Sequence, residues 1–243
     1  MRATEPRTES QSEQVAAFAA ARARALSTIA EACARVRRDP GDVTLLAVSK
    51  SVAAERLRAA TAAGLTLLGE NRVQEAEAKA PLLPGVRWHL IGPLQSNKAR
   101  KAVELFDVIE SVDSLELARR LDRIAGEVGR APLQIYLQVN VDRDAAKAGF
   151  DPDELATSLP EIAGLPGLRP VGLMTVGRQV ATAQEARPTF VRLRELSERL
   201  RSREARLGSG LSMGMTSDYA VAVEEGATLV RVGRDIFGER ALQ

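Results

Sequence analysis

The chain has 243 residues, 45% of them hydrophobic, so it can bury a substantial core and form one large α/β domain or two small ones. Its 34 lysines and arginines nearly balance 32 aspartates and glutamates, and only 3% of residues are aromatic, which argues against a nucleic-acid partner. No apolar run approaches the roughly 18 residues of a membrane-spanning helix, and the single Cys33 excludes an internal disulfide, so we expect a cytoplasmic protein without a membrane partner.

The N-terminal segment divides into a tip and a helix. The opening residues, MRATEPRTES, contain acidic residues and proline where a signal peptide needs an apolar stretch, so residues 1–12 are expected to be a flexible tip. From Glu13 to about Arg38, an alanine-rich pattern with interspersed charges predicts one amphipathic helix, which the sequence RRDPGD ends. Residues 13–243 are expected to form one domain, because no low-complexity linker divides them.

After this helix, short apolar runs alternate with helical stretches. Strands that are apolar on both faces and joined by helices indicate a parallel sheet covered by helices. Eight such units in about 250 residues are typical of a (β/α)8 TIM barrel, so we expect this α/β fold with an extra N-terminal helix. An open doubly wound sheet is the alternative, but no G-x-G-x-x-G follows the first run. The expected strands lie at 43–50, 65–71, 86–93, 106–113, 133–141, 168–176, 207–215 and 228–238, and the helices between them at 53–64, 72–80, 97–106, 115–129, 151–164, 185–204 and 217–226.

Polar residues follow the apolar runs, where the strands of a barrel reach the active-site face. The most informative is Lys50, at the end of VTLLAVSK. Desolvation at a barrel mouth disfavours the charged form of a lysine, and a neutral amine attacks a carbonyl to form a Schiff base. The alternative is a lysine that extends to solvent and pairs with Glu70. The other candidates are Ser49, Asn71, His89, Asn140, Met174, Thr175, Ser212, Gly214, Thr216, Arg231 and Gly233.

The last two runs suggest an anion site. In LSMGMTSDY, hydroxyls and backbone N–H groups precede a helix, and in VRVGRD Gly233 supplies a second loop, as in barrels that bind phosphate after strands seven and eight. The simpler reading is that Thr216 or Ser217 only caps its own helix. Arg231 lies within an apolar run and needs a partner, which is either a structural ion pair or a molecule held by Lys50. His89 is the sole histidine, so a histidine-based metal cluster is excluded and packing or hydrogen bonding is expected.

An imine-forming lysine, a phosphate loop and an arginine near a ring nitrogen together suggest a pyridoxal 5'-phosphate site. The stretches LLAVSK, GENRVQEAEAK, WHLIGPLQSNK, GLMTVG, LSMGMTSDY and VRVGRDIFG resemble those of the pyridoxal phosphate homeostasis proteins, from about residue 20 onward. That family has the barrel of the alanine racemase N-terminal domain. The resemblance implies that Lys50 carries pyridoxal phosphate, Asn71 lines it, Ser212 and the backbone of Gly233 hold its phosphate, and Arg231 faces its pyridine nitrogen.

The chain departs from the family pattern at three positions. The family usually has tyrosine at Arg72, serine at Thr216, and serine or threonine at Arg234. The first change alters the mouth, the second keeps a hydroxyl, and the third replaces a phosphate-facing hydroxyl with a guanidinium, which either grips phosphate or turns to solvent. Arg234 is therefore the least certain phosphate ligand.

An arginine that faces the ring nitrogen leaves it unprotonated and makes the cofactor a poor electron sink, which disfavours transamination. The sequence stops soon after the last strand, so we expect no second domain with a catalytic tyrosine, and neither Tyr136 nor Tyr219 replaces one. The expected function is to store, deliver or buffer pyridoxal phosphate without robust catalysis. Apo forms of enzymes that use it are the expected recipients, and we expect a monomer or weak dimer. The alternatives are an amino-acid racemase and a Schiff-base aldolase that acts on a sugar phosphate.

Overall fold

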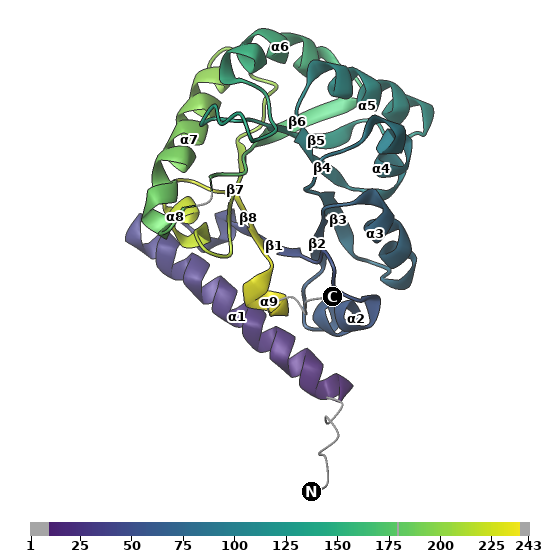
Figure 1. The fold of residues 1–243 in the computed structure, drawn as a ribbon, viewed down its shortest axis with the longest axis vertical. Helices are drawn as coiled ribbons and strands as arrows, with labels where there is room; N and C mark the ends of the chain where they lie inside the picture. Colours follow the sequence, from purple (N-terminus) through teal and green to yellow (C-terminus); the bar gives the residue numbers. More distant parts are fainter. Residues whose placement is uncertain (1–9, 179, 239–243) are drawn as a thin grey trace, which may run out of the picture.

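In the computed structural model of the chain, residues 10–178 and 180–238 are described, and within them eight parallel strands close into a barrel surrounded by helices (Figure 1). The strands pair in chain order and β8 closes on β1, so the predicted TIM barrel is confirmed. The strands are β1 (Thr44–Val48), β2 (Leu67–Glu70), β3 (Arg87–Leu90), β4 (Val108–Val112), β5 (Leu133–Gln138), β6 (Leu168–Met174), β7 (Gly210–Met215) and β8 (Leu229–Val232).

The helices follow the predicted alternation but are shorter than the sequence pattern suggests. Two predicted helices, 97–106 and 185–204, each begin as a separate 3-10 turn, η3 (Ser96–Lys98) and η4 (Ala183–Ala186). No helix among the described residues is long and apolar enough to cross a membrane. The helices are α1 (Gln11–Arg35), α2 (Ala54–Ala62), α3 (Val73–Lys79), α4 (Ala99–Leu105), α5 (Leu115–Glu127), α6 (Pro152–Gly164), α7 (Arg187–Arg201), α8 (Tyr219–Glu224) and α9 (Arg234–Phe237), with further 3-10 turns η1 (Pro40–Asp42) and η2 (Ala80–Leu82).

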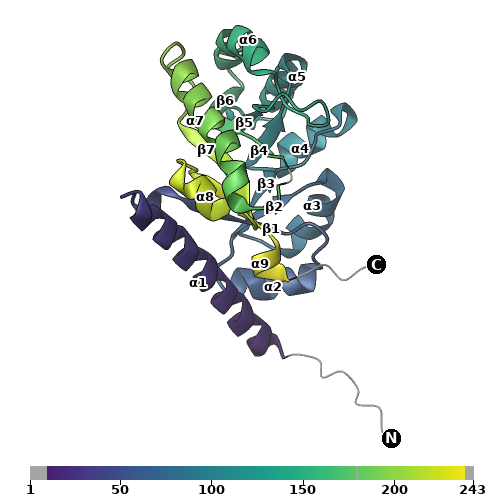
Figure 2. The ribbon, with the colours of Figure 1, turned by 60° about the vertical axis from the view of Figure 1, so that its left-hand side comes forward.

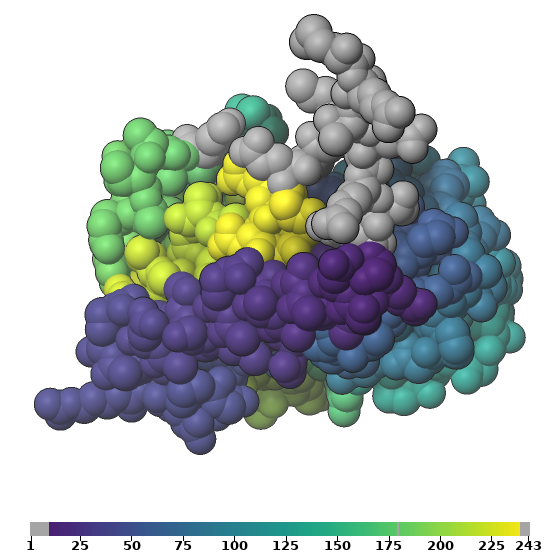
Figure 3. Space-filling model, turned by 90° about the horizontal axis from the view of Figure 1, so that it is seen from below, coloured from purple at the N-terminus to yellow at the C-terminus, as the bar shows by residue number. Residues whose placement is uncertain are grey.

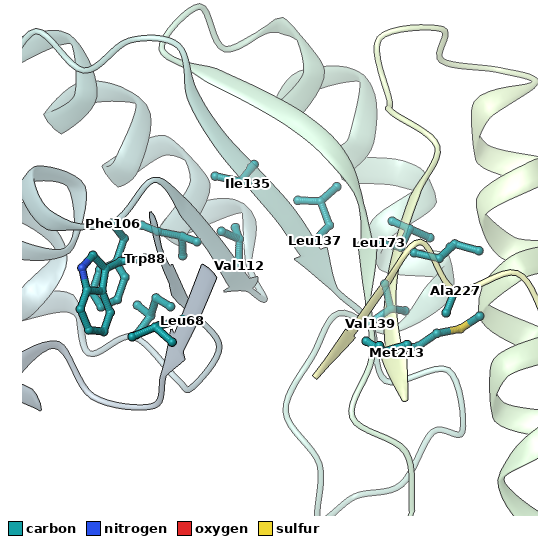
Figure 4. Packing of buried hydrophobic residues seen from close by; sticks show 14 of the residues in the cluster. Leu68, Trp88, Phe106, Val112, Ile135, Leu137, Val139, Leu173, Met213 and Ala227 are labelled. Carbon is teal, nitrogen blue, oxygen red and sulfur yellow. The ribbon is translucent and has the colours of Figure 1, made fainter. Parts of the chain in front are cut away.

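The main core lies between the strands and the helices. Side chains alternate along each strand, so one row faces the helices and the other faces the barrel interior. Outward-facing Leu68, Ile135 and Leu173 belong to this core, together with Trp88 (Figure 4). Inside the barrel, a second cluster contains Val108, Tyr136 and Met174. These two layers explain why the strands read as continuous apolar runs.

The extra helix α1 lies across α8, α9 and α2 on the outside of the barrel (Figures 2 and 3). It begins at Gln11, two residues before the expected start, because Ser10 and Glu13 form a capping box. It ends at Arg35, before the expected Arg38. Phe18 of α1 meets Phe237 of α9 edge to face, with ring centroids 5.7 Å apart. Residues 1–9 of the expected tip lie outside the described residues.

Candidate functional site

Lys50 lies in the turn directly after β1, as expected, and is partly buried. On the inner face of β1, Leu46 pairs with Arg231 of β8, and Val48 follows two residues later at the carboxyl end. The Lys50 turn therefore lies at the mouth of the barrel, in the sector where β1 meets β8. The next residue, Ser51, has a φ of 63°, so the turn is held in the left-handed region.

The loops after β7 and β8 meet beside this turn. Gly233 follows β8, and a Cβ placed on it would lie 3.5 Å from the Cβ of Val48 on β1. The backbone N–H of Gly233 donates to Thr216 Oγ1 in the loop after β7, at 3.2 Å. The two loops that the sequence suggested as an anion site are thus joined by a hydroxyl and a backbone N–H, both of which suit an anionic ligand.

Arg231 is buried inside the barrel, where a buried guanidinium needs partners, and it finds them in a network of hydrogen bonds. Its guanidinium donates to Ser212 Oγ at 2.6 Å and to the carbonyl oxygen of Thr175 at 2.7 Å. Ser212 Oγ donates in turn to Glu110 Oε2 at 2.5 Å. Glu110 Oε1 lies 2.6 Å from Nδ1 of His89, which confirms the expected hydrogen-bonding role of that histidine. Side chains of β3, β4, β7 and β8 therefore form one polar chain across the barrel.

The polar chain contains opposite charges. Burial acts to raise the pKa of Glu110. The hydrogen bond and charge of His89, the charge of Arg231 and the hydrogen bond from Ser212 lower the pKa by more than burial raises it, so it lies below its ordinary value. Burial lowers the pKa of Arg231, and the negative charge of Glu110 opposes this effect. A carboxylate thus balances a buried guanidinium through one serine.

Ser212, the predicted phosphate ligand, takes part in this polar chain. It is fully buried, and its hydroxyl both donates to Glu110 and accepts from Arg231. The residue therefore belongs to the network that holds Arg231, while Thr216, further along the same segment, is the hydroxyl that accepts from the N–H of Gly233.

Glu70 faces away from the barrel interior and takes Lys79 of α3 as its ion-pair partner, with Lys79 Nζ 2.7 Å from Glu70 Oε1. Ser49 Oγ donates to the same oxygen at 2.7 Å. Burial raises the pKa of Glu70, while the hydrogen bond and charge of Lys79 lower it in part. The ion-pair partner of Glu70 is therefore Lys79, on the outer side of the barrel.

Asn71 directly follows β2, and its backbone lies against Gly92 after β3. A Cβ on Gly92 would lie 2.3 Å from the carbonyl oxygen of Asn71, so this approach requires glycine.

Two of the departures from the family pattern lie on the surface: Arg72 is the exposed N-cap of α3, and Arg234 is the exposed first residue of α9.

Glu110 and Lys79 are charged residues next to the candidate site residues that sequence reasoning did not single out. Glu110 stands inside the strand DVIESV, and the argument that a buried charge needs a partner applies to it as much as to Arg231. The position of Lys79 has no comparable signal, because a lysine at the end of a helix is usually solvated.

The side chains at this mouth define the chemistry of a ligand. A primary amine can react with a carbonyl group, while a hydroxyl, a backbone N–H and a guanidinium bind anionic or acceptor groups. No group of three or more histidine, cysteine, aspartate or glutamate side chains able to hold a metal ion occurs within residues 10–178 and 180–238. The donors therefore suit a carbonyl compound that carries a phosphate.

Comparison with known proteins identifies the family. Residues 25–241 match the alanine racemase N-terminal domain family. The pyridoxal phosphate homeostasis protein of Pseudomonas aeruginosa is 43% identical over 90% of this chain and 94% of its own length, and that of Synechocystis is 40% identical over 83% and 93%. A structure of PipY from Synechococcus elongatus with PLP bound has a TM-score of 0.78 and 49% identity, and covers 86% of this chain and 100% of PipY. The chain therefore belongs to the pyridoxal phosphate homeostasis protein family, whose barrel is that of the alanine racemase N-terminal domain.

Proposed function

We propose that this protein binds pyridoxal 5'-phosphate and acts in vitamin B6 homeostasis by storing, delivering or buffering this aldehyde. The observation that carries the proposal is the arrangement at one sector of the barrel mouth: Lys50 after β1, the Thr216 and Gly233 loops beside it, and Arg231 below them on β8. The family name of the relatives and the PLP bound to PipY support it.

Lys50 is the proposed attachment point. Its Nζ would attack the aldehyde carbon, the carbonyl oxygen would leave as water, and the resulting C=N bond would hold the cofactor as a Schiff base. Borohydride reduces such a bond and fixes the adduct. We therefore expect a yellow protein whose phosphopyridoxyl mass, after reduction and peptide mapping, lies on Lys50. Finding that mass on Lys79, Lys98, Lys101 or Lys147 with Lys50 unmodified would contradict the assignment.

The phosphate would take the Thr216 hydroxyl and the backbone N–H of Gly233, which bond to each other in this structure. Hydrogen bonds to a charged acceptor contribute about 1.5–3 kcal/mol each. Asn71 would line the cofactor from the end of β2. Ser212 would act through Arg231, because its hydroxyl already links that guanidinium to Glu110.

Arg231 would face the pyridine nitrogen. A guanidinium has five N–H donors, and the bonds to Ser212 and Thr175 use two of them. The cofactor is an electron sink when its ring nitrogen is protonated, and an arginine at this nitrogen leaves it unprotonated. The site would then hold the aldehyde more readily than it would stabilise a substrate carbanion.

An amino-acid racemase is the second candidate, favoured by the match to the alanine racemase N-terminal domain and by an amine that can move a proton. Such an enzyme needs an acid or base on each face of its substrate. Tyr136 lies inside the barrel, where burial, followed by the negative charge of Glu110, raises its pKa to about 12, so its hydroxyl stays protonated at neutral pH and does not serve as the base. We expect no appreciable racemisation of alanine or serine on chiral chromatography after long incubation. Steady, Lys50-dependent racemisation over many turnovers would make the racemase assignment correct.

Delivery requires a recipient. We propose that apo forms of enzymes that use pyridoxal phosphate take it from this protein in the cytoplasm, and that the protein works as a monomer or weak dimer. Transfer is tested by mixing the loaded protein with an apo-enzyme and measuring the recovered activity. A purified protein that stays colourless with added cofactor would favour the third candidate, a Schiff-base aldolase acting on a sugar phosphate.

A further inference from the structure

Three charged side chains lie behind the Lys50 turn, on the outer side of the barrel. They are Glu70 at the end of β2, Glu75 within α3 and Lys79 at the end of α3, and we call them the outer ion cluster. Lys79 Nζ lies 2.7 Å from Glu70 Oε1 and 3.4 Å from Glu75 Oε2, and the side chains of Lys79 and Glu70 are 10% and 0% exposed. Lys79 and Glu70 are therefore buried between β2 and α3, whereas the side chain of Glu75 is 28% exposed.

The outer ion cluster holds the peptide bonds on both sides of Lys50. Lys79 Nζ donates to the carbonyl oxygen of Ser49 at 3.0 Å, which belongs to the peptide joining Ser49 to Lys50. Glu75 Oε2 accepts the N–H of Ser51 at 2.9 Å, which belongs to the peptide joining Lys50 to Ser51. Both ends of the lysine backbone are thus fixed by one network.

The turn needs such support. A non-glycine residue in the left-handed region, like Ser51 at φ 63°, costs about 1–2 kcal/mol and persists where its surroundings hold it. The direction in which the Lys50 side chain leaves the backbone depends on this turn.

The cluster is poorly explained as a device for stability. A buried ion pair can often be replaced by apolar side chains without loss of stability, because removing the charges from water is costly. Here the cost is visible, since Glu70 Oε2 is buried without a hydrogen-bond partner among the described residues. Nζ of Lys79 donates to three oxygen atoms, of Ser49, Glu70 and Glu75, so this side chain is engaged within the outer ion cluster.

We propose that Lys79, together with Glu70 and Glu75, is a positioning residue that fixes the backbone of Lys50 and directs its amine at the aldehyde of the cofactor. The inference rests on the proposed role of Lys50. It predicts that the cluster contributes to formation of the covalent bond and not to recognition of the phosphate or the ring.

The test compares two ligands. Pyridoxal phosphate reports the covalent bond, and its analogue with a methyl group in place of the aldehyde reports phosphate and ring contacts. Glu70→Gln/Lys79→Met removes both buried charges at once, and Lys101→Met, at an exposed lysine of α4, is the matched control. We expect the double variant to bind pyridoxal phosphate about ten- to a hundredfold more weakly, since misplacement of a reacting group by about 1 Å has effects of this size. Its affinity for the analogue and the Tm of its apo form should stay close to those of the control.

Equal losses for the two ligands, or unchanged binding of pyridoxal phosphate, would overturn the proposal. If the double variant does not fold, Glu75→Ala releases only the Ser51 side of the turn, and the same selective loss is expected. Lys50→Ala separates the two proposals. If it binds pyridoxal phosphate as tightly as the wild type, the proposed attachment to Lys50 fails. If it binds more weakly but Glu75→Ala does not, only the positioning role fails.

Discussion

Replacing Glu110 by glutamine tests whether the polar chain across the barrel holds Arg231. The carboxylate accepts one hydrogen bond from Ser212 Oγ and one from His89 Nδ1, and it balances the guanidinium through Ser212. Glutamine keeps one acceptor, while its NH2 group is a donor that faces another donor. The substitution therefore removes a charge and one hydrogen bond with little change of shape.

The magnitude follows from the burial of the pair. A lost hydrogen bond that leaves a buried group unsatisfied costs about 1–3 kcal/mol, and removing one partner of a buried charge pair costs about 3–5 kcal/mol. Glu110 is fully buried and Arg231 is 4% exposed, so solvent does not screen the loss. We expect Glu110→Gln to lower the free energy of unfolding by about 3–5 kcal/mol.

Urea unfolding at pH 7 measures this change, with Glu104→Gln on the exposed face of α4 as the control. The double variant Glu110→Gln/Arg231→Met has no unpaired buried charge. Its loss of unfolding free energy should therefore be smaller than the sum of the losses in the two single variants. A Glu110→Gln protein as stable as the control would refute the reasoning, as would strictly additive losses in the double variant.

Three further predictions follow from the site. Thr216→Val should weaken the binding of pyridoxal phosphate much more than that of unphosphorylated pyridoxal, whereas Ser212→Ala should weaken the binding of both alike if it acts through Arg231. Titrations of the visible absorbance would show this, and a phosphate-selective loss for Ser212→Ala would make Ser212 a phosphate ligand, as the sequence predicts. The pKa of Glu110 is lowered on folding, so below about pH 4.5 the unfolded chain binds more protons than the folded one. In urea titrations across that range, acid should therefore destabilise the wild type more steeply than Glu110→Gln. Parallel pH profiles of the two proteins would contradict this. Gly92→Ala would place a Cβ 2.3 Å from the carbonyl oxygen of Asn71, so it should lower the Tm and weaken cofactor retention, and an unchanged protein would show that this contact is soft.

The fold was predictable from sequence because the signal repeats along the whole chain. Each apolar run between helical stretches became a strand, and the carboxyl ends of β1, β7 and β8 brought Lys50, Thr216 and Gly233 into one sector. Helix ends were less predictable, since they depend on local hydrogen bonds such as the capping box of Ser10 and Glu13.

The partners inside and outside the barrel could not be read from the sequence. Ser212 and Glu110 are separated by 102 residues, and their contact exists because the closed barrel brings the inward-facing side chains of β4 and β7 together in its interior. The link between Lys79 and the carbonyl of Ser49 likewise depends on how α3 packs against the end of β1. Residue type shows that a buried charge needs a partner, whereas the closed barrel determines which partner it finds.

The position of α1 has a consequence for biosynthesis. This helix is synthesised before the barrel strands, yet it packs on α8 and α9, which are synthesised after most of them, and its Phe18 meets Phe237 of α9. Until residues 219–237 emerge, a growing chain exposes the apolar face of α1 and cannot close β8 on β1. Such a chain is open to aggregation during synthesis. The seam between β1 and β8, at whose mouth Lys50 lies, therefore forms only after β8 has been synthesised.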